Sequence, residues 1–191
     1  MKIGLYFGSF NPIHHGHLII ANHILSNTGL SQIWFIVSPQ NPLKPSSALL
    51  NEYHRLHLVR LAIEGEDKFK ASDFEFHLPR PSYTIDTLTY LQEKYPQHEF
   101  AIIMGSDSLS NITKWKNYQQ ILSNHAILVY LRPNHPVNET ISATNLTVLQ
   151  APLLEISATY IRDNVKNGKS IRYLVPANVM EEIGRNRYYS G

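Results

Sequence analysis

Two histidines near the start of the chain have a spacing that suits phosphate binding. The segment Gly8-Ser9-Phe10-Asn11-Pro12-Ile13-His14-His15-Gly16-His17 follows an apolar run and precedes an apolar stretch of helical period. A helix N-terminus presents free N–H groups and a partial positive charge, and both favour phosphate. Because His14 and His17 are three residues apart, they share one face if the first helical turn includes both. We expect their imidazoles to donate hydrogen bonds to phosphate oxygens, more strongly as negative charge builds up there.

Two glycines in this segment strengthen the prediction of phosphate binding beyond what the pair of histidines indicates alone. Gly8 allows the backbone to approach a ligand closely, and Gly16 leaves room at the start of the helix. A lone histidine is more often a surface or capping residue than a ligand, and this alternative applies here too. The coincidence of strand, glycine loop, paired histidines and helix start favours phosphate binding. His15 is expected to point away from both neighbours, and the remaining histidines are interpreted as structural: His23, His54, His57, His77, His98, His125 and His135.

A second segment with hydroxyl and guanidinium groups lies late in the chain. Ile156-Ser157-Ala158-Thr159-Tyr160-Ile161-Arg162 follows the last expected strand and opens a helix. Ser157 and Thr159 offer hydroxyls at that helix N-terminus, and Arg162 adds a forked cation suited to phosphate oxygens. Taken alone, the segment also fits an ordinary capped helix with a solvated arginine. Nearby, Gly168-Lys169-Ser170 has the ending of a P-loop but lacks its first glycine, since Asp163 stands there, and we reject that interpretation.

The elements that must position these segments alternate between strand and helix. Strands are expected at Lys2–Phe7, Gln32–Ser38, Phe69–Phe76, Glu99–Met104, Ala126–Leu131 and Thr147–Gln150. Helices are expected at His17–Ser26, Leu50–Ile63, Thr84–Tyr95, Tyr118–Leu122 and Ala158–Asn167, followed by a short one with Pro176 in its first turn and Gly184 near its end. Several strands are apolar at nearly every position, which indicates a parallel sheet covered on both faces. The pattern predicts an α/β, doubly wound fold whose ligands bind beyond the carboxyl ends of the strands.

Composition limits the classes of function. The 191 residues fit one domain, here 1–191, and 17 Lys and Arg against 15 Asp and Glu leave a net charge of +2. That charge is too weak to predict binding to nucleic acid or to a membrane surface. Cysteine is absent, which excludes disulfides and cysteine catalysis. No apolar run approaches a membrane span and none resembles a signal peptide, so we expect a cytoplasmic protein. A homo-oligomer is compatible with the sequence, which does not reveal the oligomeric state.

The two segments resemble a known pair of motifs. His14-His15-Gly16-His17 resembles the HxGH signature of the nucleotidyltransferase α/β-phosphodiesterase superfamily, which has a Rossmann-like fold. The late segment is similar to the ISSTxxR motif of adenylyltransferases, with Ala158 in place of one serine. Between them, the order of further motifs is similar to that of bacterial nicotinate-nucleotide adenylyltransferases over nearly the whole chain: Pro81-Ser82-Tyr83-Thr84, Gly105-Ser106-Asp107-Ser108-Leu109, Trp115 and Arg132-Pro133. Phe7, Ser9 and Asn11 depart from the Gly, Thr and Asp of many members.

The resemblance implies a set of site residues. Catalysis would involve His14, His17 and Arg162, and ATP would contact Gly8, Ser9, Phe10, Gly16, Gly105, Asp107, Ser157 and Thr159. The acceptor would be held by Lys44, Tyr83, Thr84 and Trp115. Trp115 offers a flat face for a pyridine ring, and Thr84 at a helix start offers a hydroxyl and free N–H groups to its carboxylate. Taken singly, each of these residues also fits a structural role.

The implied reaction is adenylyl transfer from ATP to nicotinate mononucleotide, a step of NAD biosynthesis. The acceptor phosphate is already an anion, so direct in-line attack needs no protein nucleophile, and catalysis is chiefly positioning and charge stabilisation. Mg²⁺ would accompany ATP, held by the phosphates because few protein ligands are evident and no metal site is expected in the protein itself. Three alternatives stay open: nicotinamide mononucleotide as acceptor, pantetheine phosphate as acceptor, and a nucleotide sensor without catalysis.

Overall fold

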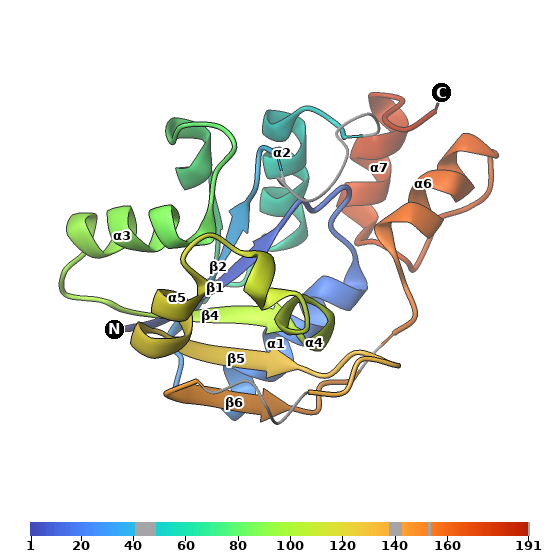
Figure 1. The fold of residues 1–191 in the computed structure, drawn as a ribbon. Helices are drawn as coiled ribbons and strands as arrows, with labels where there is room; N and C mark the ends of the chain where they lie inside the picture. The colour runs from blue at the N-terminus through green and yellow to red at the C-terminus, as the bar shows by residue number, and fades with distance from the viewer. Residues whose placement is uncertain (41–48, 138–142, 153, 191) are drawn as a thin grey trace.

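The computed structural model describes residues 1–40, 49–137, 143–152 and 154–190, and it places a parallel sheet between two layers of helices (Figure 1). Within these residues the sheet has the strand order β3-β2-β1-β4-β5-β6, and every adjacent pair is parallel. The strands are β1 (Lys2–Gly8), β2 (Gln32–Val37), β3 (Phe69–Ser72), β4 (Glu99–Gly105), β5 (Ala126–Tyr130) and β6 (Asn145–Leu149). The order reverses between β1 and β4, where ligands bind in doubly wound folds. The predicted fold class is therefore confirmed.

The helices follow the strands as the sequence pattern predicts. They are α1 (His15–Asn27), α2 (Glu52–Ala62), α3 (Thr84–Lys94), α4 (Ser106–Leu109), α5 (Tyr118–Asn124), α6 (Ala158–Lys166) and α7 (Ala177–Arg185), with short 3-10 turns η1 (Phe74–His77) and η2 (Ile112–Lys114). The predicted cap Ser157 accepts a hydrogen bond from the Tyr160 N–H, and Gly168 after α6 has a positive φ of 64°. Pro176 precedes α7 rather than lying in its first turn. None of the helices in the described ranges is long and apolar enough to cross a bilayer.

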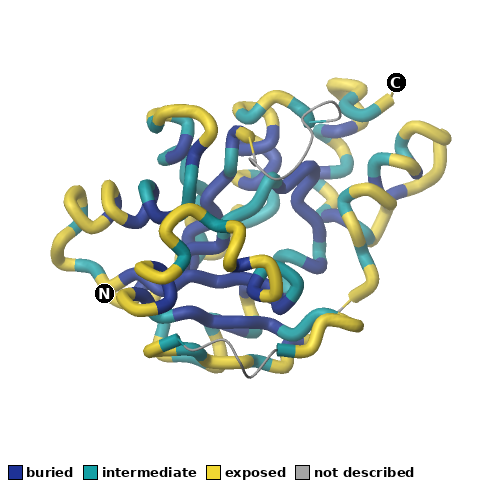
Figure 2. The backbone as a smooth tube through the Cα atoms, viewed as in Figure 1, coloured by how far each residue is buried: buried dark blue, intermediate teal, exposed yellow. Residues whose placement is uncertain are grey.

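Alternate strand residues enter two separate cores, which explains why the strands are apolar throughout. In β4, Ala101 and Ile103 face a core shared with α1, α2, α6 and α7. Ile102 and Met104 face the opposite core, shared with α3, α4 and α5. The central strands are dark blue in Figure 2 because both of their faces are covered.

The two edge strands differ from the prediction. The strand expected at Phe69–Phe76 ends at Ser72, because its pairing with β2 stops at Ile36. The chain then turns into η1, with the Ser72 hydroxyl accepting from the Phe74 N–H at 3.2 Å. At the other edge, β6 begins at Asn145 and has partly or fully exposed residues along its length, so it is not covered on both faces (Figure 2). Edge strands lack a second partner, which makes their ends hard to read from sequence.

Candidate active site

The two histidines meet at the start of α1 in the geometry that their spacing predicts. His14 is the N-cap residue and His17 is the third residue of the helix. Their rings are stacked, with centroids 3.7 Å apart. The His14 backbone N–H donates to His17 Nδ1 at 3.3 Å. Since Nδ1 of His17 acts as an acceptor, its neutral imidazole carries the proton on Nε2, which is then available as a donor.

Burial keeps both imidazoles neutral at neutral pH. His14 is only 6% exposed, and its pKa is lowered to about 4, first by burial and then by the nearby charges of Arg132 and His15. Burial also lowers the pKa of His17 well below its usual value, with further contributions from His14 and Arg132. Within the described part of the chain, the buried Nδ1 of His14 has no hydrogen-bond partner. Unpaired buried polar atoms are rare in folded proteins, and some of them lie at functional sites.

Both glycines of the first loop make room for aromatic rings. A Cβ on Gly16 would lie 3.0 Å from Cε1 and Nδ1 of His14. A Cβ on Gly8 would lie 2.8 Å from Cζ of Phe10. The ring of Phe10 is buried and packs edge-on to His17 with centroids 5.1 Å apart. Phe10 therefore supports His17 from the core, and any contact of Phe10 with ATP must come from its backbone.

The late helix reaches the same loop. In α6, Nη1 of Arg162 donates to the carbonyl oxygen of Asn11 at 2.8 Å, and Nη2 donates to Oγ1 of Thr159 at 3.1 Å. The carbonyl of Ile156 lies 3.9 Å from the Cβ position of Gly16. Residues 151 positions apart in the chain are thus in direct contact, and the start of α6 stands beside the loop that follows β1 (Figure 1). The two segments singled out in the sequence converge.

Further polar residues lie after β4, on the other side of the switch point. Asp107 folds back over Gly105, where a Cβ would collide with its Oδ1. Oδ1 of Asp107 also lies 3.8 Å from Nε of Arg132. The Arg132 guanidinium stacks over the Tyr130 ring at 5.4 Å, and the Tyr130 hydroxyl accepts from Tyr6 at 3.3 Å. Arg132 entered the sequence argument only as part of a motif, and the structure places it close enough to lower the pKa of both histidines.

The residues predicted for the acceptor lie on the opposite face of the sheet from α1. Thr84 is the first residue of α3, as expected, and Tyr83 is its N-cap. Tyr83 and Trp115 are half-buried against the core beneath α3 and α5. Lys116 links their surroundings, since its Nζ lies 2.9 Å from Asp86 and 5.0 Å from the centroid of the Tyr83 ring.

These residues border the same end of the sheet as the residues predicted to bind phosphate. Tyr83 and Thr84 belong to the connection that leaves the carboxyl end of β3, and Trp115 belongs to the one that leaves β4. Within the described ranges they make no hydrogen bond, ion pair or ring contact with His14 or His17, so the two groups are related by the topology of the sheet. Lys44 falls in residues 41–48, outside the described part of the chain, and its role stays a prediction.

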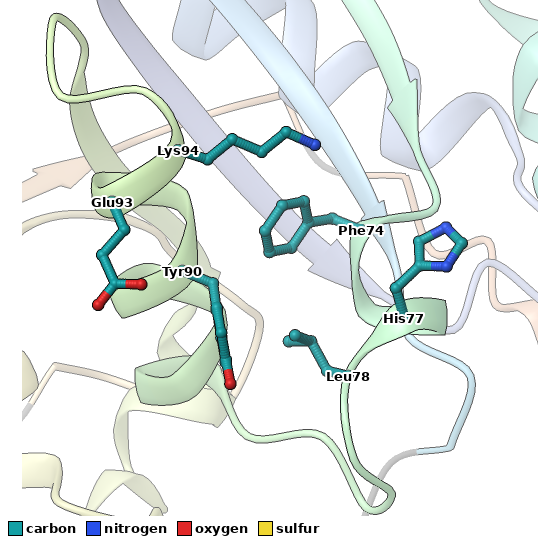
Figure 3. A pocket seen from close by; sticks show the side chains of 6 residues that line it. All are labelled: Phe74, His77, Leu78, Tyr90, Glu93 and Lys94. Carbon is teal, nitrogen blue, oxygen red and sulfur yellow. The ribbon is translucent and has the colours of Figure 1, made fainter.

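A separate hollow of about 500 Å³ opens between η1 and α3 (Figure 3). Its walls carry Phe74, His77, Leu78, Tyr90, Glu93 and Lys94. Phe74 and Tyr90 face each other across it, and Nζ of Lys94 lies 5.5 Å from the Phe74 ring centroid. None of these residues was predicted to contact ATP or the acceptor.

Two buried charged residues escaped the sequence reasoning. Arg55 in α2 is fully buried, and Glu75 in η1 accepts hydrogen bonds from Ser82 at 2.8 Å and Thr87 at 2.9 Å. Burial raises the pKa of Glu75, against the effect of these hydroxyl donors. A signal for Arg55 existed, because it lies three and four residues before Leu58 and Val59 on the buried stripe of the helix. A charged residue on such a stripe is rare unless it has partners.

Known proteins are similar in sequence to this chain along nearly its full length. The family model described as cytidylyltransferase-like matches residues 5–164. A probable nicotinate-nucleotide adenylyltransferase of Flavobacterium psychrophilum is 52% identical over 191 residues, covering 99% of both chains. A protein of the same name from Cytophaga hutchinsonii is 54% identical over 190 residues, covering 100% of this chain and 99% of the relative.

A solved structure shares the fold at lower identity. The nicotinic acid mononucleotide adenylyltransferase of Plasmodium falciparum, complexed with NaAD, superposes with a TM-score of 0.84 at 21% identity, covering 98% of this chain and 97% of that one. The strand order, the paired histidines at the first helix and the matches over the full chain agree with one another. This chain belongs to the cytidylyltransferase-like family and, within it, to the nicotinate-nucleotide adenylyltransferases.

Proposed function

We propose that this chain transfers the adenylyl group of ATP to nicotinate mononucleotide, giving deamido-NAD and pyrophosphate as a step of NAD biosynthesis. The curated relatives carry the name of this activity. The observation that supports it best is the 2.8 Å hydrogen bond from Arg162 to the carbonyl of Asn11, because it brings two helix N-termini to one place. Two such termini with neutral donors and a guanidinium suit a triphosphate.

The reaction is an in-line substitution at phosphorus. An oxygen of the acceptor phosphate forms a bond to the α-phosphorus of ATP while the bond to the bridging oxygen of the β-phosphate breaks. The leaving pyrophosphate takes the electron pair of that bond, and no proton has to be removed from the attacking group. The protein therefore contributes position and charge stabilisation rather than a nucleophile or a base.

The early helix stabilises the charge that develops at the α-phosphate. His17 donates from Nε2 to a phosphate oxygen, because its Nδ1 is held by the His14 backbone N–H. His14 offers a second imidazole from the same face, stacked on the first. Ser9 and the glycines of the loop supply backbone groups at close range. Donors aimed at developing charge are worth most in a site that is already organised.

The late helix holds the leaving group. Arg162 donates to the carbonyl of Asn11 and to Thr159, which fixes its guanidinium at the mouth of the first loop. Its remaining donors, with the hydroxyl of Ser157 and the N–H groups at the start of α6, bind pyrophosphate oxygens. Asp107, held near Arg132, accepts from the ribose hydroxyls of ATP.

Mg²⁺ would accompany ATP into the site. Within the described residues, no three His, Asp or Glu side chains gather in a way that could hold a metal ion. A cation carried chiefly by phosphate oxygens and water is the usual mode for Mg²⁺. Bound in this way, the cation would neutralise part of the phosphate charge during transfer.

Parallel assays of three acceptors test the proposal. Pyrophosphate release is followed with ATP and nicotinate mononucleotide, nicotinamide mononucleotide or pantetheine phosphate, all at matched concentrations. We expect nicotinate mononucleotide to give the highest kcat/KM, because Thr84 and the start of α3 offer donors to its carboxylate. A higher value with either other acceptor would replace the proposed substrate. ATP binding without pyrophosphate release from any acceptor would indicate a nucleotide sensor.

A further inference from the structure

Arg55 connects the loop that follows β1, which carries Ser9, to neighbouring segments of the chain. The side chain is fully buried in α2, and its hydrogen bonds reach four main-chain carbonyls. Nε donates to Leu50 at 2.7 Å, Nη1 donates to Ser9 at 2.5 Å and to Ser38 at 2.8 Å, and Nη2 donates to Pro39 at 3.1 Å. A single cation therefore connects the loop after β1, the loop after β2 and the segment that leads into α2.

These bonds are unusual for a buried arginine because all four acceptors are carbonyls. Burial lowers the pKa of Arg55 to about 10, so the side chain remains charged at neutral pH. Within the described residues no carboxylate forms an ion pair with Arg55, and Glu52, which pairs with Arg80, acts on it only through its charge. A buried charge costs free energy, which well-placed carbonyl dipoles offset only in part. The buried charge does not stabilise α2 itself. The arrangement is explained if the charge organises the loops that it touches.

Hydrogen bonds of Asn11 connect these loops to Arg162. The Leu50 N–H donates to Oδ1 of Asn11 at 3.2 Å, and the Tyr189 hydroxyl donates to the same oxygen at 2.9 Å. The main-chain carbonyl of Asn11 is the group that receives Nη1 of Arg162. Asn11 thus lies between Arg55, which holds Ser9 and Leu50, and the arginine of the late helix.

We propose that Arg55 is a positioning residue for adenylyl transfer, which acts through Ser9, Leu50 and Asn11 to place the guanidinium of Arg162. Arg55 touches no substrate in this role. Lysine keeps the charge but cannot reproduce the planar fork that reaches four carbonyls. The inference rests on the proposed function, since its consequences are observed in ATP binding and turnover.

The test compares Arg55→Lys with Arg60→Lys, an exposed arginine of the same helix. We expect Arg55→Lys to weaken ATP binding, measured by titration without acceptor, and to lower kcat, each on the order of tenfold. Acceptor binding, measured without ATP, should change less than about twofold because α3 and η2 receive no bond from Arg55. Arg60→Lys should match the wild type throughout. Equal losses for ATP and acceptor, or no loss for either, would overturn the proposal.

A double-mutant cycle separates positioning from general stability. If Arg55 acts through Arg162, then Arg55→Lys should cost much less in an Arg162→Ala background than in the wild type. Effects that simply multiply would contradict the proposed route. Inactive wild-type protein would instead count against the proposed function alone. If Arg55→Lys does not fold, Tyr189→Phe removes one bond to Asn11 and should weaken ATP binding by about threefold; unchanged ATP binding would refute the inference.

Discussion

Replacement of His14 by asparagine should flatten the pH dependence of stability. In the folded chain the pKa of His14 is about 4, against a usual value of 6.5, and burial is the main cause. Between these two values the unfolded chain binds a proton that the folded chain does not. The stability contributed by neutral His14 is therefore fully present above about pH 6.5 and is lost as the pH falls toward 4.

The size of this effect follows from the two pKa values. The full shift of 6.5 to about 4 corresponds to about 3 kcal/mol, and the part lost between pH 7 and pH 5 is about 2 kcal/mol. Removal of His14 also relieves its electrostatic effect on His17, whose pKa lies well below normal. Without His14, the pKa of His17 should rise toward its usual value, so His17 also contributes less to the loss of stability at low pH. The fall in the free energy of unfolding between pH 7 and pH 5 should therefore be smaller than in the wild type by at least about 2 kcal/mol.

Urea unfolding at pH 7, 6 and 5 and constant ionic strength measures the effect. The wild type, His14→Asn and His135→Asn are compared, because His135 is exposed and loses little hydration on folding. The free energy of unfolding should decrease as the pH is lowered from 7 to 5, both in the wild type and in His135→Asn. In His14→Asn the fall should be smaller by about 2 kcal/mol. Parallel curves for all three proteins would show that His14 is not buried in the neutral form.

Three further substitutions test the site. His17→Ala should lower kcat on the order of a hundredfold or more, the usual loss of one transition-state donor; near-normal pyrophosphate release would remove His17 from the mechanism. Gly16→Ala places a methyl group 3.0 Å from the His14 ring, and we expect kcat to fall about tenfold with acceptor binding retained; an unchanged kcat would show that the ring tolerates displacement. Trp115→Ala should weaken the pyridine nucleotide more than ATP in titrations, and equal weakening of both would argue against stacking.

The sequence pattern was sufficient to predict those features of the structure that depend on a short residue period. The strands of the sheet centre repeat apolar residues because both faces are covered, and His14 and His17 share a face because three residues make almost one turn. The same local rules identified Ser157 as a cap. Convergence of the early and late segments was also predicted, because both follow strands of one parallel sheet at its carboxyl edge.

Partners distant in sequence could not be predicted from one chain. Nothing in the run from Leu50 to Ile63 says that Arg55 binds carbonyls of Ser9 and Ser38, since a helical arginine is usually solvated. The expected strand at Phe69–Phe76 failed for a related reason. Its last residues bury Glu75 against the hydroxyls of Ser82 and of Thr87 in α3. The apolar residues on either side of Glu75 made the segment resemble a strand.

The resting charge of the site has a consequence for catalysis. Arg162 and Arg132 are permanent cations at this end of the sheet, and burial together with Arg132 keeps both imidazoles neutral. A cation that binds ATP and the transition state equally well raises affinity without raising kcat. Neutral imidazoles donate more strongly as negative charge accumulates on the α-phosphate oxygens, and their pKa rises with it. In the proposed reaction, where His14 and His17 contact the α-phosphate, their stabilising effect is therefore greatest in the transition state, which is the condition for raising kcat rather than affinity alone.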